Sequence, residues 1–201
     1  LTGQDMARWQ PGIEAPLALD YGRYRVLKPG PWSQAPVLLQ QLALLKGHDL
    51  GGMSPTDPDF LHLWVETAKL AFADREAFYG DPDFSDVPMA EMLSEPYNAA
   101  RAKLIDMKRA QDFGHGKPPK GGTVYLTAAD ASGMMVSYIQ SNYMGFGSGI
   151  VVPGTGISLQ NRGGTFVLKP GHPNCVGPKK RPYQTIIPGF LTRDGKPVMS
   201  F

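Results

Sequence analysis

The sequence lacks several features that would assign it to a particular class of protein. Its single cysteine, Cys175, excludes an internal disulfide framework and a metal site built from several cysteines. Twenty Lys and Arg residues against 18 Asp and Glu leave a net charge of +2, which gives no indication of binding to nucleic acid or an anionic membrane. No apolar run approaches the length of a membrane span, and no signal-peptide pattern stands at the start.

What the sequence does contain is an apolar fraction of 42% and an excess of turn-forming residues. The apolar fraction is sufficient for a packed core in a chain of 201 residues. Its 24 glycines and 19 prolines exceed a fifth of the chain, which predicts many tight turns. The chain starts without Met and stops within a predicted strand, so we expect an excerpt of a longer polypeptide; a complete, trimmed domain is the alternative.

Residues 1–112 have mainly helical patterns. A strand pair is predicted over 17–31, followed by a helix over about 36–46 that Ser33 caps and Gly47 ends. A longer helix begins near Pro58 with Asp57 as its N-cap, and a third runs from about Ser94 to Arg109. Apolar residues at three- and four-residue spacing predict one apolar face on the long helix: Phe60, Leu61, Trp64, Val65, Ala68, Ala71 and Phe72.

The remainder of the chain has mainly β patterns. Residues 113–122 are rich in Gly, Pro and Lys, which is typical of an exposed, flexible connection. Two predicted strands, 123–129 and 134–141, form a hairpin around the turn at 130–133, and a last hairpin turns at 193–195. The glycine-rich segment 145–149 lacks the Lys-Ser/Thr of a phosphate-binding loop, so it indicates a backbone bend.

The sequence gives little support for a metal site or a reactive thiol. The four histidines (His48, His62, His115 and His172) are scattered without metal-ligand spacing, so we expect no metal and no cofactor. No local signature marks Cys175 as a nucleophile.

Thr123 is the more informative position, because it begins a predicted strand directly after the glycine-rich connection. Its hydroxyl is a poor nucleophile unless the Gly122–Thr123 bond is cut. The new α-amino group could then act as its general base. The residues alone leave open the simpler interpretation, that Thr123 is only a strand former.

Several motifs in the same order resemble the γ-glutamyltransferase family of N-terminal-nucleophile hydrolases, and in particular its γ-glutamyltransferase-like branch. They extend over nearly the whole chain: 1–5 (LTGQD), 70–75 (LAFADR), 79–84 (YGDPDF), 86–88 (DVP), 140–143 (QSNY), 146–156 (FGSGIVVPGTG), 160–163 (QNRG) and 180–182 (KRP).

The resemblance implies an α/β (α+β) four-layer αββα sandwich, only partly covered by this chain. It also implies a proenzyme that cleaves itself between Gly122 and Thr123. Residues 1–122 would then be the C-terminal part of a large subunit and 123–201 the N-terminal part of a small, catalytic one. The two subunits would form a heterodimer.

The resemblance also implies a mechanism. Thr123 would attack an amide carbonyl to form an acyl-enzyme, which water or an amine then releases. Ser141 matches a hydroxyl position close to the nucleophile and would orient it. The Gly-Gly oxyanion hole would lie beyond Phe201, and the arginine that grips the substrate carboxylate would precede Leu1.

The chain departs from the family pattern at positions that bind the substrate in the family. By the resemblance, the substrate-binding positions are Tyr143, which aligns with an asparagine that helps hold the glutamyl α-amino group, Arg162 and Thr165, which align with a Gln and an Asp, and Gln184 and Thr185, which align with the paired serines that hold the α-carboxylate. The Asp-to-Thr165 change removes a counter-charge for a ligand ammonium, which Arg162 would repel.

A glutaryl- or oxamate-like amide would suit Arg162 better than a γ-glutamyl amide. In the alternative interpretation, Arg162 points to solvent or pairs with another residue of this branch.

The leading hypothesis is therefore a self-processing amidohydrolase or acyltransferase acting on γ-glutamyl or related amides. The rival hypothesis is a non-catalytic fragment or pseudoenzyme that packs with a partner chain. A ligand-binding module would need tight binding without turnover. The compartment stays undetermined, because a signal peptide would lie upstream of Leu1.

Overall fold

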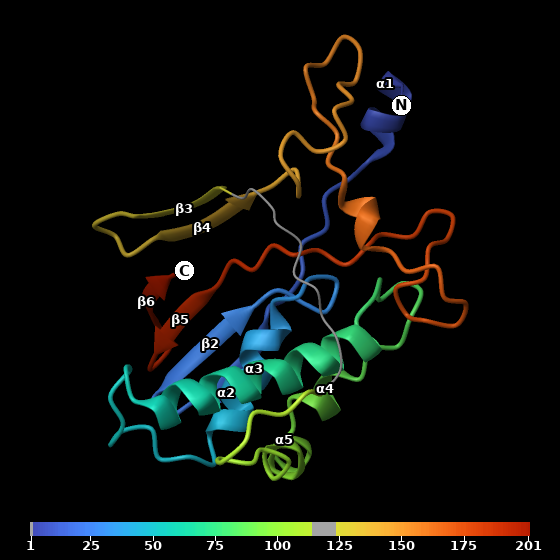
Figure 1. Cartoon of the computed structure of the whole chain (residues 1–201). Helices are drawn as coiled ribbons and strands as arrows, with labels where there is room; N and C mark the ends of the chain where they lie inside the picture. Colours follow the sequence, from blue (N-terminus) through green and yellow to red (C-terminus); the bar gives the residue numbers. More distant parts are fainter. Residues whose placement is uncertain (1, 114–123) are drawn as a thin grey trace.

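The computed structural model describes residues 2–113 and 124–201. The predicted cleavage site at Gly122 and Thr123, and most of the predicted connection, lie outside these residues. The central element is a four-stranded antiparallel sheet in the order β1-β2-β5-β6 (Figure 1). Its strands are β1 (Leu17–Tyr21), β2 (Tyr24–Lys28), β5 (Phe190–Arg193) and β6 (Lys196–Ser200).

Helices cover the sheet from one side. They are α2 (Pro36–Leu45), α3 (Pro58–Phe78), α4 (Met89–Met92) and α5 (Glu95–Ala102). Helix α1 (Gly3–Arg8) lies apart from the sheet, near the N-terminus, and has no buried residue (Figure 1). Helix α2 lies between β1 and β2 on one side and α3 on the other. Leu39 and Ala43 of α2 pack on Leu19 and Val26 of the sheet, so the core forms at this helix.

A separate hairpin, β3 (Val124–Ala129) and β4 (Met135–Gln140), lies across β5 and β6 from the helices (Figure 1). Val124 pairs with Gln140 at its open end. Thr127 shares a hydrogen bond with Ser200 of β6, and Ser137 Oγ donates to the Phe201 carbonyl oxygen at 3.3 Å. The predicted mixture of helix and sheet is confirmed.

The segments on either side of residues 114–123 share one sheet, because β2 pairs directly with β5. Val26 lies opposite Leu191 in this pairing. A second link joins Asp81 to Arg181, whose Nη2 donates to Asp81 Oδ1 at 2.7 Å. The two parts of the chain are therefore held together by backbone pairing and by ion pairs.

Most predicted elements are confirmed, with local corrections. Asp57 is the N-cap of α3, and its Oδ1 accepts from the Asp59 amide at 3.0 Å. Ser33 does not cap α2: its hydroxyl accepts from the Ala35 amide, before the helix begins at Pro36. The third helix, α5, ends at Ala102, and turns replace its predicted continuation to Arg109.

The predicted apolar face of α3 is mostly not the face that packs. Leu61, Trp64, Val65 and Phe72 are between 38% and 50% exposed. The buried face carries Leu63, Glu66, Thr67, Leu70, Ala71 and Asp74. Its polar members are satisfied by partners, so their burial is tolerated: Asp74 alone accepts from Gln40, Tyr97 and Arg101.

Candidate functional site

Ser141 follows β4 directly, at the end of the hairpin where β3 begins. Its Oγ accepts from the Tyr143 amide at 2.9 Å. Tyr143 is 8% exposed and has a φ of 75°, an unusual conformation for a large residue. The chain thus turns sharply after the hairpin, and the Tyr143 ring points into the protein.

Arg162 links these residues to the segment before β5. It is 1% exposed and begins the 3-10 helix η1 (Arg162–Thr165). Its Nη1 donates to Thr185 Oγ1, its Nη2 donates to the Ser141 carbonyl oxygen at 3.4 Å, and its Cζ lies 5.2 Å from the centre of the Tyr143 ring.

This cation has no ion pair with any carboxylate within residues 2–113 and 124–201. Burial lowers the pKa of Arg162, although the guanidinium stays protonated.

The structure brings Ser141, Tyr143, Arg162 and Thr185 together, and Thr165 and Gln184 lie beside this group. The Thr165 hydroxyl donates to the Arg162 carbonyl oxygen at 2.8 Å, a hydrogen bond that joins the last residue of η1 to its first. Gln184 is the neighbour of Thr185, and its side chain lines a separate cavity.

Two residues that sequence reasoning did not select hold this segment in place. Gln34 donates from its backbone amide to the Gln184 carbonyl oxygen at 2.7 Å and from Nε2 to the Thr185 carbonyl oxygen at 3.1 Å. Arg75 Nη1 donates to Gln34 Oε1 at 2.7 Å. Arg75 belongs to the 70–75 motif, and that motif was the only sequence signal for this contact.

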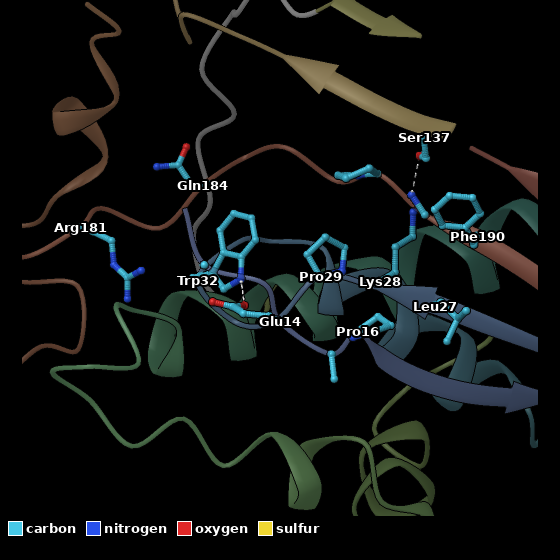
Figure 2. Close-up of a pocket in the computed structure, with 15 residues that line it drawn as sticks. Glu14, Pro16, Leu27, Lys28, Pro29, Trp32, Ser137, Arg181, Gln184 and Phe190 are labelled. Atoms are coloured by element: carbon cyan, nitrogen blue, oxygen red, sulfur yellow. Dashed lines mark hydrogen bonds between the residues drawn. The ribbon is translucent and has the colours of Figure 1, made fainter. Parts of the chain in front are cut away.

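The cavity beside Gln184 has a volume of about 570 Å³ and lies between β2, β4 and the segment before β5 (Figure 2). Trp32 and Phe190 contribute apolar walls. Lys28 is 2% exposed at its edge, and its Nζ donates to the Ile187 carbonyl oxygen at 3.0 Å. Because water is excluded from the ammonium, its pKa falls to about 8.

The other singled-out residues have structural partners. His172 Nδ1 accepts from the Asn174 amide, so its Nε2 is the protonated nitrogen and donates to the Glu76 carbonyl oxygen at 2.8 Å. His62 Nε2 lies 3.0 Å from the Asp106 carbonyl oxygen. Cys175 is a half-buried free thiol. Gly145, Gly147 and Gly149 all have positive φ in a turn that opens no helix.

In the described part of the chain, no group of three or more His, Cys, Asp or Glu residues is arranged to hold a metal ion. No helix there is both long and apolar enough to cross a membrane.

Comparison with known proteins assigns the chain to a family. The family model described as gamma-glutamyltranspeptidase matches residues 1–201. The chain therefore belongs to the γ-glutamyltranspeptidase family, as the sequence motifs predict.

Named relatives come from several bacteria. The chain is 36% identical to the glutathione hydrolase-like YwrD proenzyme of Bacillus subtilis, over 91% of this chain and 34% of that protein. It is 38% identical to the oxamate amidohydrolase proenzyme of Klebsiella pneumoniae, over 98% of this chain and 40% of that protein. The chain thus spans little more than a third of the length of these relatives.

A solved structure supports the fold. The crystal structure of cephalosporin acylase from Bacillus halodurans matches with a TM-score of 0.87 and 43% identity, over 100% of this chain and 36% of that one. The predicted fold of this hydrolase class is confirmed, with the chain supplying only part of it.

Proposed function

We propose that this chain belongs to a self-processing amidohydrolase or acyltransferase in which Thr123 is the N-terminal nucleophile. Cleavage between Gly122 and Thr123 would give residues 1–122 to a large subunit and 123–201 to a small one. The relatives' names support processing, because several are proenzymes. The backbone pairing of β2 with β5 supports a heterodimer that stays assembled after cleavage.

The observation that carries the proposal is the position of Ser141. It follows β4 at the end of the hairpin where Val124, the residue after Thr123, begins β3. A nucleophile at this end of the hairpin would be accompanied by a hydroxyl that can orient it. It would also be near Arg162, which donates to the Ser141 carbonyl oxygen, and near Thr185.

The proposed reaction proceeds in two steps. The Thr123 hydroxyl attacks the amide carbonyl carbon while its proton passes to the free α-amino group of Thr123. The C–N bond then breaks, the amine leaves with that proton, and an acyl-enzyme ester remains. In the second step water or an acceptor amine attacks the ester and releases the acyl group, which restores the hydroxyl.

The proposed substrates are γ-glutamyl amides or related glutaryl- or oxamate-like amides. Thr165 stands where the family pattern has an aspartate, and Arg162 brings a positive charge to the same place. These two differences favour an acyl group without a free α-amino group. The name of the Klebsiella relative, an oxamate amidohydrolase, is consistent with such an acyl group.

The proposal is tested on the full-length protein by release of p-nitroaniline from γ-glutamyl-p-nitroanilide and glutaryl-p-nitroanilide. We expect turnover that Thr123→Ala abolishes and that Thr56→Ala, at an exposed threonine, leaves intact. Faster turnover of the γ-glutamyl compound would reject the altered acyl group. An uncut chain without turnover would favour the non-catalytic alternative.

A further inference from the structure

The hairpin of β3 and β4 faces the rest of the protein with hydroxyl groups. Its outer face is exposed, with Leu126 at 52% and Tyr138 at 56%. The inner face carries Tyr125, Thr127 and Ser137, and each of their hydroxyls takes part in a hydrogen bond. Hydrogen bonds are directional, whereas apolar packing is not, so these hydroxyls define where the hairpin sits.

The Ser137 hydroxyl lies where three segments of the chain meet. Its Oγ accepts from the Gly189 amide at 3.2 Å and donates to the Phe201 carbonyl oxygen at 3.3 Å (Figure 2). Because a serine hydroxyl has a single hydrogen, the Tyr125 phenol, 3.0 Å away, must donate to Ser137. The one hydrogen and both lone pairs of Ser137 are therefore occupied. They join β3 to the residues next to β5 and β6.

The residues that Ser137 contacts are themselves held in place. Gly189 and Phe201 exchange two backbone hydrogen bonds, of 2.6 Å and 2.9 Å. From the side of β2, Lys28 Nζ donates to the Ile187 carbonyl oxygen at 3.0 Å and lies 3.9 Å from the centre of the Phe201 ring. A Cβ on Gly189 would lie 2.5 Å from Lys28 Nζ, so the glycine gives this lysine its room. Ser137 thus joins the hairpin to a fixed support.

A second contact joins the hairpin to the same segment. Arg162 donates to the Ser141 carbonyl oxygen and to Thr185 Oγ1, and Ser137 bonds to Gly189. Ser141 follows Ser137 by four residues, and Gly189 follows Thr185 by four. The two segments therefore lie side by side with matching intervals between their contacts. Two separated contacts leave the hairpin little freedom to slide or to rotate.

We propose that Ser137 is a positioning residue for the proposed nucleophile. Tyr125 follows Thr123 by two residues in the sequence, so the hydrogen bond from Tyr125 to Ser137 fixes the start of β3 against the segment before β5. Ser137 acts on the reaction through the backbone of β3. This inference rests on the proposed function, because it concerns how Thr123 is held. A displacement of about 1 Å in a reacting group can slow the chemical step about 100-fold.

The test measures kcat and KM of the full-length protein with whichever of glutaryl- and γ-glutamyl-p-nitroanilide the wild type turns over faster. Ser137→Ala should lower kcat about 10- to 100-fold and change KM less than about threefold, because only the nucleophile is displaced. Tyr125→Phe removes one of the three hydrogen bonds and should lower kcat about 3- to 10-fold. Ser137→Thr keeps the hydroxyl and should restore kcat to within about threefold of the wild type, a margin smaller than the loss of one hydrogen bond. The control, Tyr138→Phe, changes an exposed tyrosine of β4 and should leave kcat unchanged.

The division of the loss between kcat and KM distinguishes positioning from a merely structural role. A lower melting temperature with a wild-type kcat in Ser137→Ala would overturn the inference, and so would a loss carried by KM alone. Ser137→Ala combined with Tyr125→Phe should lose no more kcat than Ser137→Ala does. Multiplying losses would mean that Tyr125 acts independently of Ser137, which would also overturn it. If Ser137→Ala does not fold, Tyr125→Phe decides, and a wild-type kcat in that variant would overturn the inference.

Hydrogen–deuterium exchange of β3 separates failure of this inference from failure of the proposed function. In Ser137→Ala the amides of β3 should exchange about fivefold faster than in the wild type, as expected when one hydrogen bond is lost. Faster exchange, in a protein whose wild type turns over no amide, would uphold the positioning of β3 and overturn the proposed function. Unchanged exchange and kcat, in an enzyme that Thr123→Ala inactivates, would overturn the inference alone. Unchanged exchange without turnover would overturn both.

Discussion

Replacing Asp81 with asparagine should weaken the link between the two parts of the chain. Asp81 is 1% exposed and accepts from the Arg181 backbone amide at 2.8 Å and from Nη2 at 2.7 Å. Removing one partner of a buried ion pair costs about 3–5 kcal/mol. Arg181 is half exposed and keeps Asp83 as a partner, so we expect a smaller loss of about 2–3 kcal/mol.

The matched control is Asp83→Asn, because Asp83 pairs with the same arginine at 2.8 Å. Its side chain is 73% exposed, so its loss should stay below about 1 kcal/mol. The assay is the free energy of unfolding of the full-length protein in urea. Equal effects of the two substitutions at pH 7 would refute the reasoning, which depends on the burial of Asp81.

The pH dependence gives a second check on Asp81. Burial alone would raise its pKa, but hydrogen bonds and charge from Arg181 outweigh burial and lower the pKa below 3.8. The unfolded state therefore binds a proton at a higher pH than the folded state does. The stabilisation by ionised Asp81 is complete above the pKa of the unfolded state and is lost as the pH falls through the pKa of the folded state. The gap between wild type and Asp81→Asn should shrink below about pH 4; a constant gap would contradict this assignment.

Two further predictions concern buried positions. Gly80→Ala would put a Cβ 2.5 Å from the Pro173 carbonyl oxygen, so it should destabilise the protein by about 1–3 kcal/mol. The control, Gly47→Ala, adds a Cβ in open space and should leave the stability unchanged. Equal melting temperatures of the two variants would contradict this prediction. Lys28 has a pKa of about 8 against 10.5 when exposed, so the unfolded state binds more protons between these values. The free energy of unfolding of the wild type should therefore rise by about 3 kcal/mol relative to that of Lys28→Met between pH 7 and pH 11. A difference between the two proteins that does not change with pH would contradict the lowered pKa of Lys28.

Local signals predicted much of the secondary structure. Asp57 before Pro58 marks a helix start whatever packs around it, and the turn at 130–133 sets the hairpin of β3 and β4. The packed face of α3 was mispredicted because the helix is apolar on more than one side. Glu66 and Asp74 are buried only because Lys69, Gln40 and Arg101 supply partners. Those partners are tertiary contacts, which periodicity does not contain.

The candidate site, too, could be predicted from the sequence only in part. Ser141, Tyr143, Arg162 and Thr185 could be selected from family motifs, and the structure brings them together. The burial of Arg162 behind Thr185 could not be predicted, because it depends on contacts between segments 23 residues apart. The contact of Gln34 with Thr185 spans 151 residues, so no local pattern indicates it.

The most direct test of the central claim is the mass and N-terminal sequence of the polypeptides in a native preparation of the full-length protein. Self-processing with Thr123 as nucleophile predicts two polypeptides, the smaller beginning at Thr123, and a single uncut chain in Thr123→Ala. A native preparation that contains one intact polypeptide, or that is cut at a different bond, would contradict the account.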